Sequence, residues 1–93
     1  MRVVSLFVVI FWFASVANTW SLDAKQWFVE GNRLSSKGQF KEAADAYQKS
    51  IDQNPLAPVA HYNLGIAYKN LQQLDKAANV LEKAVELAPT NLD

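Results

Sequence analysis

Few side chains in this sequence are of the types that perform catalysis or bind metals. His61 is the only histidine and cysteine is absent, which excludes thiolate nucleophiles, disulfides and zinc–thiolate sites. The acidic pairs Glu42 with Asp45 and Glu82 with Glu86 have the spacing of neighbours on one helix face, with lysines nearby. No metalloprotease, phosphate-loop or serine-hydrolase motif occurs. We therefore expect no catalytic residue, no metal and no cofactor.

His61 by itself does not indicate a site. The acidic residues Asp75 and Glu82 are distant from it in the sequence. We interpret His61 as a partly buried packing residue. The alternative interpretation is a ligand or a pH-sensitive group.

The charge balance argues against nucleic-acid binding. The chain has 93 residues, with Lys plus Arg equal to Asp plus Glu at 9 each. Binding to phosphates requires a basic surface that displaces counterions, and no basic tail or stripe supplies one. The length also leaves room for only one small folded unit.

The N-terminus has the pattern of a secretory signal peptide. Arg2 provides a positive charge, residues 3–14 form an apolar run, and small residues follow up to Ala17. This pattern predicts a signal peptide over residues 1–17, cleaved after Ala17, and a short linker over residues 18–23. The expected location is secreted or periplasmic, or the lumen of the endoplasmic reticulum.

A retained membrane anchor is the alternative for the same segment. The apolar stretch from residue 3 to residue 17 is short, because a helix needs about 20 apolar residues to span a bilayer. Contact with a membrane is expected only if this segment is retained.

The rest of the sequence repeats itself at a fixed offset. Sliding the sequence along itself by one fixed shift, which we call the repeat offset, places Gly31 on Gly65, Ala43 on Ala77, and Pro55 on Pro89. Apolar residues recur at steps of three and four in each unit, which indicates helices. We predict two units, over residues 24–57 and 58–91, with residues 92–93 as the start of a third.

Each unit is predicted to be two helices joined by a tight turn. In the first unit, Gly38 can adopt the left-handed conformation that ends a helix, and Pro55 stops the second helix. In the second unit the helices are expected over residues 59–71 and 74–87. The turn between them, at Gln72 and Gln73, contains no glycine.

This pattern resembles two tandem tetratricopeptide repeats. The residues that carry the resemblance are Trp27, Gly31, Ala43, Tyr47 and Pro55 in the first unit, and Leu64, Gly65, Tyr68, Ala77, Leu81, Ala84 and Pro89 in the second. The sequence departs from the family pattern at Glu30, Leu34, Ser50 and His61. The resemblance implies an all-α fold, a solenoid of tandem antiparallel helix pairs, preceded here by the N-terminal hydrophobic helix.

The resemblance also implies a function, because the first helices of such repeats line an inner groove. A peptide or an inserted helix of a partner protein can be held in that groove by amides and aromatic side chains. The expected groove residues are Lys25, Phe28, Asn32, Ser35, Tyr62, Asn63, Ile66 and Lys69. We therefore expect a non-catalytic protein–protein interaction scaffold that binds no nucleic acid.

Two further interpretations stay open. The chain can be the N-terminal piece of a larger enzyme, such as a glycosyltransferase whose repeats present substrate, or a membrane-anchored assembly factor. The apolar edge from residue 80 to residue 87 is expected to lack cover, since repeat arrays generally need about three units or a polar terminal helix. This edge predicts a piece of a longer repeat protein, or a small module that self-associates or docks on a partner through the C-terminal face.

Overall fold

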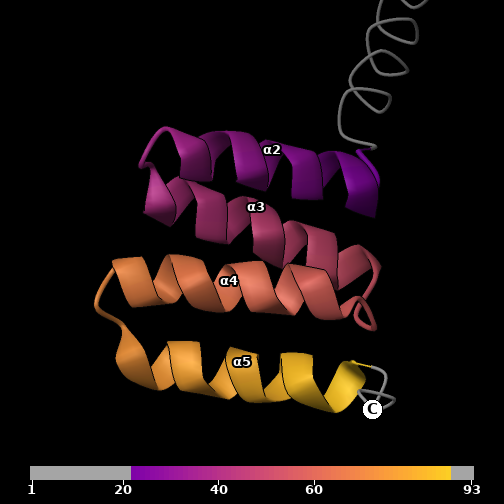
Figure 1. Cartoon of the computed structure of the whole chain (residues 1–93). Coiled ribbons are helices and arrows are strands. Elements are labelled where there is room, and N and C mark those ends of the chain that lie inside the picture. The colour runs from indigo at the N-terminus through magenta and orange to yellow at the C-terminus, as the bar shows by residue number, and fades with distance from the viewer. Residues whose placement is uncertain (1–21, 89–93) are drawn as a thin grey trace, which may run out of the picture.

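The computed structural model describes residues 22–88 of the protein, which form four α-helices and, over that range, no strand. The helices are α2 (Ala24–Ser36), α3 (Phe40–Gln53), α4 (Pro58–Asn70) and α5 (Leu74–Leu87). They stack in chain order as two antiparallel pairs (Figure 1). The predicted all-α solenoid is confirmed.

Several predictions fall outside these residues. The hydrophobic helix over residues 1–17, Pro89 and the start of a third unit at residues 92–93 all lie beyond the described range. Within residues 22–88, none of the helices combines the length and the apolar character that a bilayer crossing requires.

The helix ends follow from local sequence. Asp23 and Gln26 form a capping box at the start of α2, where each side chain accepts a hydrogen bond from the backbone N–H of the other, at 2.8 and 2.9 Å. Helix α4 begins at Pro58, one residue earlier than expected, because proline has no N–H to satisfy in the first turn. Helix α5 has the bounds that the sequence predicts.

The two tight turns have the same backbone conformation. Gly38 has a φ of 77°, and Gln72, its counterpart at the repeat offset, has a φ of 64°. In both turns the next N–H bonds back to the preceding helix, from Gln39 to Leu34 at 3.0 Å and from Gln73 to Tyr68 at 2.9 Å. The second turn therefore adopts a left-handed conformation without the glycine that favours it.

Small residues allow the paired helices to approach closely. A Cβ atom added at Gly31 would lie 2.5 Å from the Tyr47 ring, and one added at Gly65 would lie 2.6 Å from Leu81. The helices of each pair therefore cross closely at these two glycines. Around them lies a core of mostly small side chains, formed by Ala43, Ala44, Tyr47, Ile51, Ala60, Leu64 and Ala67.

His61 belongs to this packed interior. It is buried, and its Nδ1 lies 2.9 Å from the carbonyl oxygen of Ala57 one turn earlier. Because a carbonyl oxygen only accepts, Nδ1 carries the proton. The interpretation of His61 as a packing residue is confirmed.

The left-handed backbone conformation of Gln72 leads to a prediction about stability. Gln72→Gly should stabilise the protein by about 0.5 to 1 kcal/mol, because a residue with a Cβ is strained in this region and glycine is not. Gly38→Ala, which adds a Cβ atom at the equivalent left-handed position of the first turn, should destabilise the protein by a similar amount. Urea denaturation of both variants measures the two effects. Equal midpoints for Gln72→Gly and the unchanged protein would contradict the assignment of strain.

Candidate protein-binding groove

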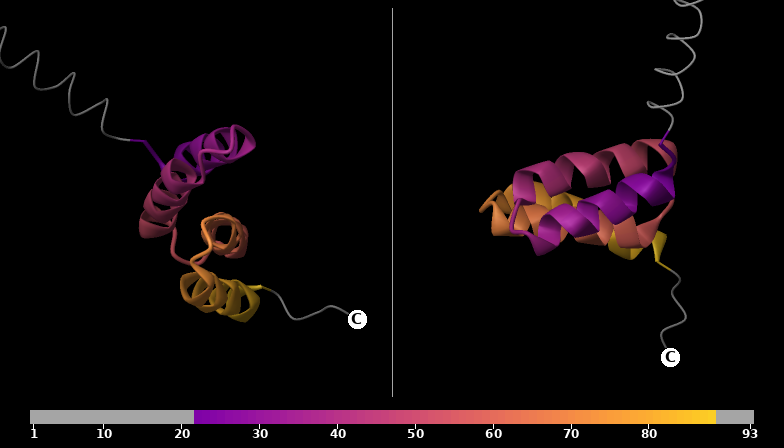
Figure 2. Two further views of the ribbon diagram at one scale, coloured as in Figure 1. Left: turned by 90° about the vertical axis from the view of Figure 1, so that its left-hand side faces the viewer. Right: turned by 90° about the horizontal axis from the view of Figure 1, so that it is seen from above.

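Helices α2 and α4 lie on the same side of the stack, with α3 on the other (Figure 2, left). Between them is a cavity of about 270 Å³. It is lined by Asn32, Ser35, Ser36, Tyr47, Asn63 and Ile66. Four of the eight predicted groove residues therefore meet here, namely Asn32, Ser35, Asn63 and Ile66. We call this cavity the amide groove.

The amide groove is organised by one oxygen atom. Asn32 Oδ1 accepts a hydrogen bond from the Tyr47 hydroxyl at 2.6 Å and another from Asn63 Nδ2 at 3.1 Å. Side chains from α2, α3 and α4 thus meet at one point, and the two repeats are tied together by this contact. Tyr47 is buried, so its hydroxyl needs such an acceptor.

Each of the two side-chain amides has a second polar atom that can bind a ligand. Among residues 22–88, no hydrogen bond engages the Asn32 amide nitrogen or the Asn63 carbonyl oxygen. One is a donor and the other an acceptor, which matches the two groups of a peptide backbone. The arrangement can therefore bind a backbone, and no described group of three or more His, Cys, Asp or Glu residues could hold a metal.

The protonation state of Tyr47 supports this network. Burial raises the pKa of the Tyr47 phenol above its ordinary value, while contacts with Asn63 and Ser35 act in the opposite direction. The hydroxyl consequently keeps its proton at neutral pH and donates to Asn32.

The other four predicted residues lie elsewhere. Phe28 packs on the core, with its ring centroid 5.8 Å from that of Tyr47, and together with Lys25 it lines a separate cavity of about 330 Å³. Tyr62 is 53% exposed and lines a third, apolar cavity beside α5. Lys69 is exposed and lines none of these three cavities.

Two residues of the amide groove are not among those predicted to line it. The sequence pattern assigns Tyr47 to packing alone, and it does not single out Ser36. The sequence does contain a signal for Tyr47. The repeat offset pairs it with Leu81, so the equivalent position of the second unit is apolar. A tyrosine in place of an apolar core residue indicates a hydroxyl that needs a partner.

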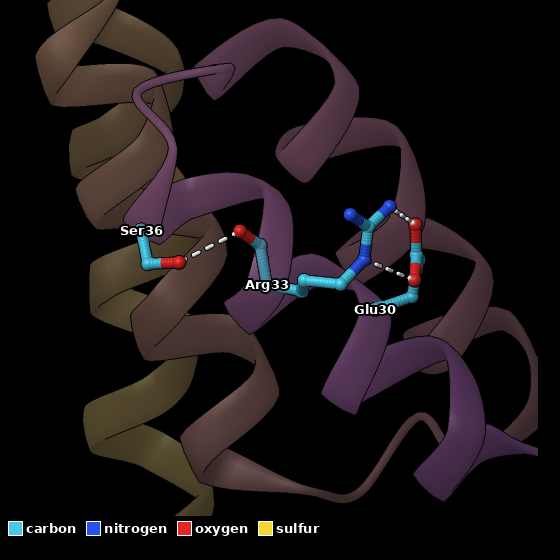
Figure 3. Close-up of polar contacts among 3 residues, drawn as sticks. All are labelled: Glu30, Arg33 and Ser36. Atoms are coloured by element: carbon cyan, nitrogen blue, oxygen red, sulfur yellow. Dashed lines mark hydrogen bonds and ion pairs between the residues drawn. The ribbon is translucent and has the colours of Figure 1, made fainter.

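Helix α2 also carries a polar group formed by Glu30, Arg33 and Ser36 (Figure 3). Arg33 Nε donates to Glu30 Oε1 at 3.0 Å, and a second bond joins the same two side chains. The hydrogen bond from Arg33 lowers the pKa of Glu30. The Ser36 hydroxyl donates to the Arg33 carbonyl at 2.8 Å. Neither Glu30 nor Arg33 lines the amide groove.

Two stacked helix pairs with a polar groove across their first helices define a helical-repeat interaction module. The chain belongs to the tetratricopeptide repeat family: one TPR repeat model matches residues 31–72, and a tetratricopeptide repeat model matches residues 58–91. Tetratricopeptide repeats generally form protein–protein interaction modules.

Two of three similar proteins are named for these repeats. A TPR repeat-containing protein of Methanocaldococcus jannaschii is 25% identical over 73% of this chain and 12% of its own length. The photosystem I assembly protein Ycf3 of Prochlorococcus marinus is 40% identical, over 58% of this chain and 39% of its own length. The small glutamine-rich tetratricopeptide repeat-containing protein 2 of Mycosarcoma maydis is 33% identical over 71% of this chain and 19% of its own length. The chain thus spans less than half the length of these relatives.

The Tyr47–Asn32 bond can be tested by removing one hydroxyl. Tyr47→Phe should destabilise the protein by about 1 kcal/mol at neutral pH, since it removes one partner of a part-buried hydrogen bond. Because the folded pKa of Tyr47 lies above its unfolded value of 10.0, its contribution is complete below pH 10 and declines as the pH rises through the folded pKa.

The unchanged protein should therefore lose more stability than Tyr47→Phe between pH 9 and pH 11, measured by urea denaturation at each pH. Tyr62→Phe, at an exposed tyrosine, is the control and should follow the unchanged protein. The same alkaline loss in Tyr47→Phe would contradict the role given to this phenol.

Proposed function

We propose that the amide groove binds an extended segment of a partner protein. The observation that carries the proposal is a pair of amide groups that no hydrogen bond engages among residues 22–88, the Asn32 nitrogen and the Asn63 carbonyl oxygen, on neighbouring first helices. Together they can pair with one peptide unit of the ligand, while Ile66 offers apolar contact to a side chain.

The chemistry of the groove favours an extended peptide over an inserted helix. A helix satisfies its own backbone groups and binds through an apolar face, whereas an extended segment offers free N–H and C=O groups. The amide groove is small, about 270 Å³, and five of its six lining residues carry a polar side-chain atom. Such a surface complements a backbone.

In this proposal the module is a non-catalytic scaffold. Its only histidine is buried and bonded to a backbone carbonyl, and the described acidic side chains form no metal-binding group. The similarity to a photosystem I assembly protein supports a role in bringing proteins together.

The test uses peptides selected from a random display library against the purified protein. Asn63→Ala should weaken the selected peptides at least tenfold, because it removes the acceptor but leaves the Tyr47–Asn32 bond. The matched control is Asn79→Ala, which removes an exposed amide from α5. Isothermal titration calorimetry gives the affinities, and circular dichroism checks that helicity is unchanged. Equal affinities for both variants would place recognition outside the amide groove.

We further propose that the module works outside the cytoplasm. This rests on the signal-peptide pattern of residues 1–17, which lie outside the described residues. N-terminal sequencing of the protein recovered from an expressing culture should begin at Asn18. A sequence that begins at Met1 would contradict cleavage and favour the retained anchor.

A further inference from the structure

A second cavity continues the amide groove toward the start of the first helices. Its volume is about 330 Å³, and its lining includes Lys25 and Phe28 on α2 and Val59 on α4. Phe28 precedes Asn32 by one helical turn on α2. Val59 precedes Asn63 by one turn on α4. On both helices this cavity therefore lies one turn from the amide pair. We call it the Phe28 pocket.

The Phe28 pocket differs from the amide groove in its chemistry. Five of its eight lining residues are apolar, namely Ala24, Phe28, Ala57, Val59 and Ala60. In the amide groove only Ile66 has no polar side-chain atom. The buried Ser50 hydroxyl, which also lines the pocket, already donates its proton to the Ala24 carbonyl at 2.8 Å. The pocket therefore suits an apolar side chain, and the amide groove suits a backbone.

Lys25 gives the Phe28 pocket its one charge. The side chain is exposed, and no ion pair engages its ammonium among residues 22–88. The same chain twice places a lysine ammonium over an aromatic ring, with Lys49 Nζ 4.5 Å from the Trp27 centroid and Lys76 Nζ 5.7 Å from that of Tyr68. A ring beside Phe28 offers Lys25 a contact of this kind, which an aliphatic side chain does not.

The distance between the two cavities sets where this ring stands on a ligand. One turn of helix separates them, a rise of about 5 to 6 Å. An extended chain advances about 3.3 Å per residue. A segment that runs along α2 and α4 therefore passes from the amide pair to the Phe28 pocket in about two residues.

We propose that the Phe28 pocket binds an aromatic side chain of the partner segment, about two residues from the peptide unit that pairs with Asn32 and Asn63. This inference rests on the function proposed for the amide groove and adds the chemical class of the segment. The segment is the occupant because the pocket continues the groove in which that segment lies. Its ring packs between Phe28 and Val59, with the Lys25 ammonium over its face.

The first test uses the peptides that a random display library selects against the purified protein. They should share one aromatic position. Alanine at that position should weaken binding at least tenfold, measured by isothermal titration calorimetry. Cyclohexylalanine has a similar shape but no π-electrons, and it should weaken binding about two- to fivefold. Selected peptides with no shared aromatic position would overturn the inference.

A lysine variant tests the contact with the ring. Lys25→Gln should weaken the aromatic peptide about two- to fivefold and leave the affinity of the cyclohexylalanine peptide unchanged. The matched control is Lys41→Gln, at an exposed lysine of α3, which should change neither affinity. If Lys25→Gln weakens both peptides equally, the ammonium does not lie over the ring.

A pair of valine variants tests the position of the ring. Val59 is 58% exposed and Val29, which does not line the pocket, is 56% exposed, so they are matched sites. Val59→Gln should weaken the aromatic peptide at least threefold and its alanine derivative much less, because only the first places a side chain beside it. Val29→Gln should affect neither peptide. An equal effect of Val59→Gln on both peptides would place the ring outside the pocket.

The outcomes separate this inference from the function on which it rests. If Asn63→Ala weakens the selected peptides but loss of their ring does not, the amide groove binds the segment and the Phe28 pocket does not. If Asn63→Ala has no effect, the proposed function fails and this inference fails with it.

One competing occupant belongs to the chain itself. Trp20 is an aromatic residue that lies outside the described residues. Trp20→Ala should leave the affinity for the aromatic peptide unchanged. A tighter affinity in this variant would show that Trp20 competes for the pocket, and its assignment to a partner would be wrong.

Discussion

The close approach of the two helices within each repeat is the constraint on which the rest of the structure depends. No side chain fits at Gly31 beneath the Tyr47 ring, or at Gly65 beneath Leu81. Because the backbones lie this close, the large residue of the second helix reaches across the first. The Tyr47 hydroxyl reaches Asn32 in the amide groove across this crossing.

Tyr47 converts this packing constraint into a binding feature. Its ring fills the space over Gly31, and its hydroxyl emerges beside Asn32 on the groove side. Leu81 fills the corresponding space in the second repeat but has no polar atom. The amide cluster therefore forms once, at the junction of the repeats, and Asn63 joins it from α4. Core packing and groove chemistry share one side chain here.

The sequence was sufficient for the fold and for part of the candidate site. Helix periods, the repeat offset, Gly38 and the prolines predict the two helix pairs, because these signals are local or repetitive. Asn32 and Asn63 could be assigned to one groove because they lie on the first helices. The separation of Phe28 and Tyr62 from that groove could not be predicted, since it depends on how the helices pack in three dimensions. Likewise, the strained Gln72 turn is visible only in its backbone angle.

The ion pair on α2 has a consequence for the order in which the protein is made. A ribosome releases a chain from its N-terminus, so α2 and α3 emerge before α4. With Glu30 and Arg33 outward, the first repeat meets water and chaperones with a charged side from the moment it forms. Within residues 22–88, each new helix covers part of the apolar surface of the helix before it. Within residues 22–88, the charged side of α2 therefore gives a neighbouring nascent chain less apolar surface to join.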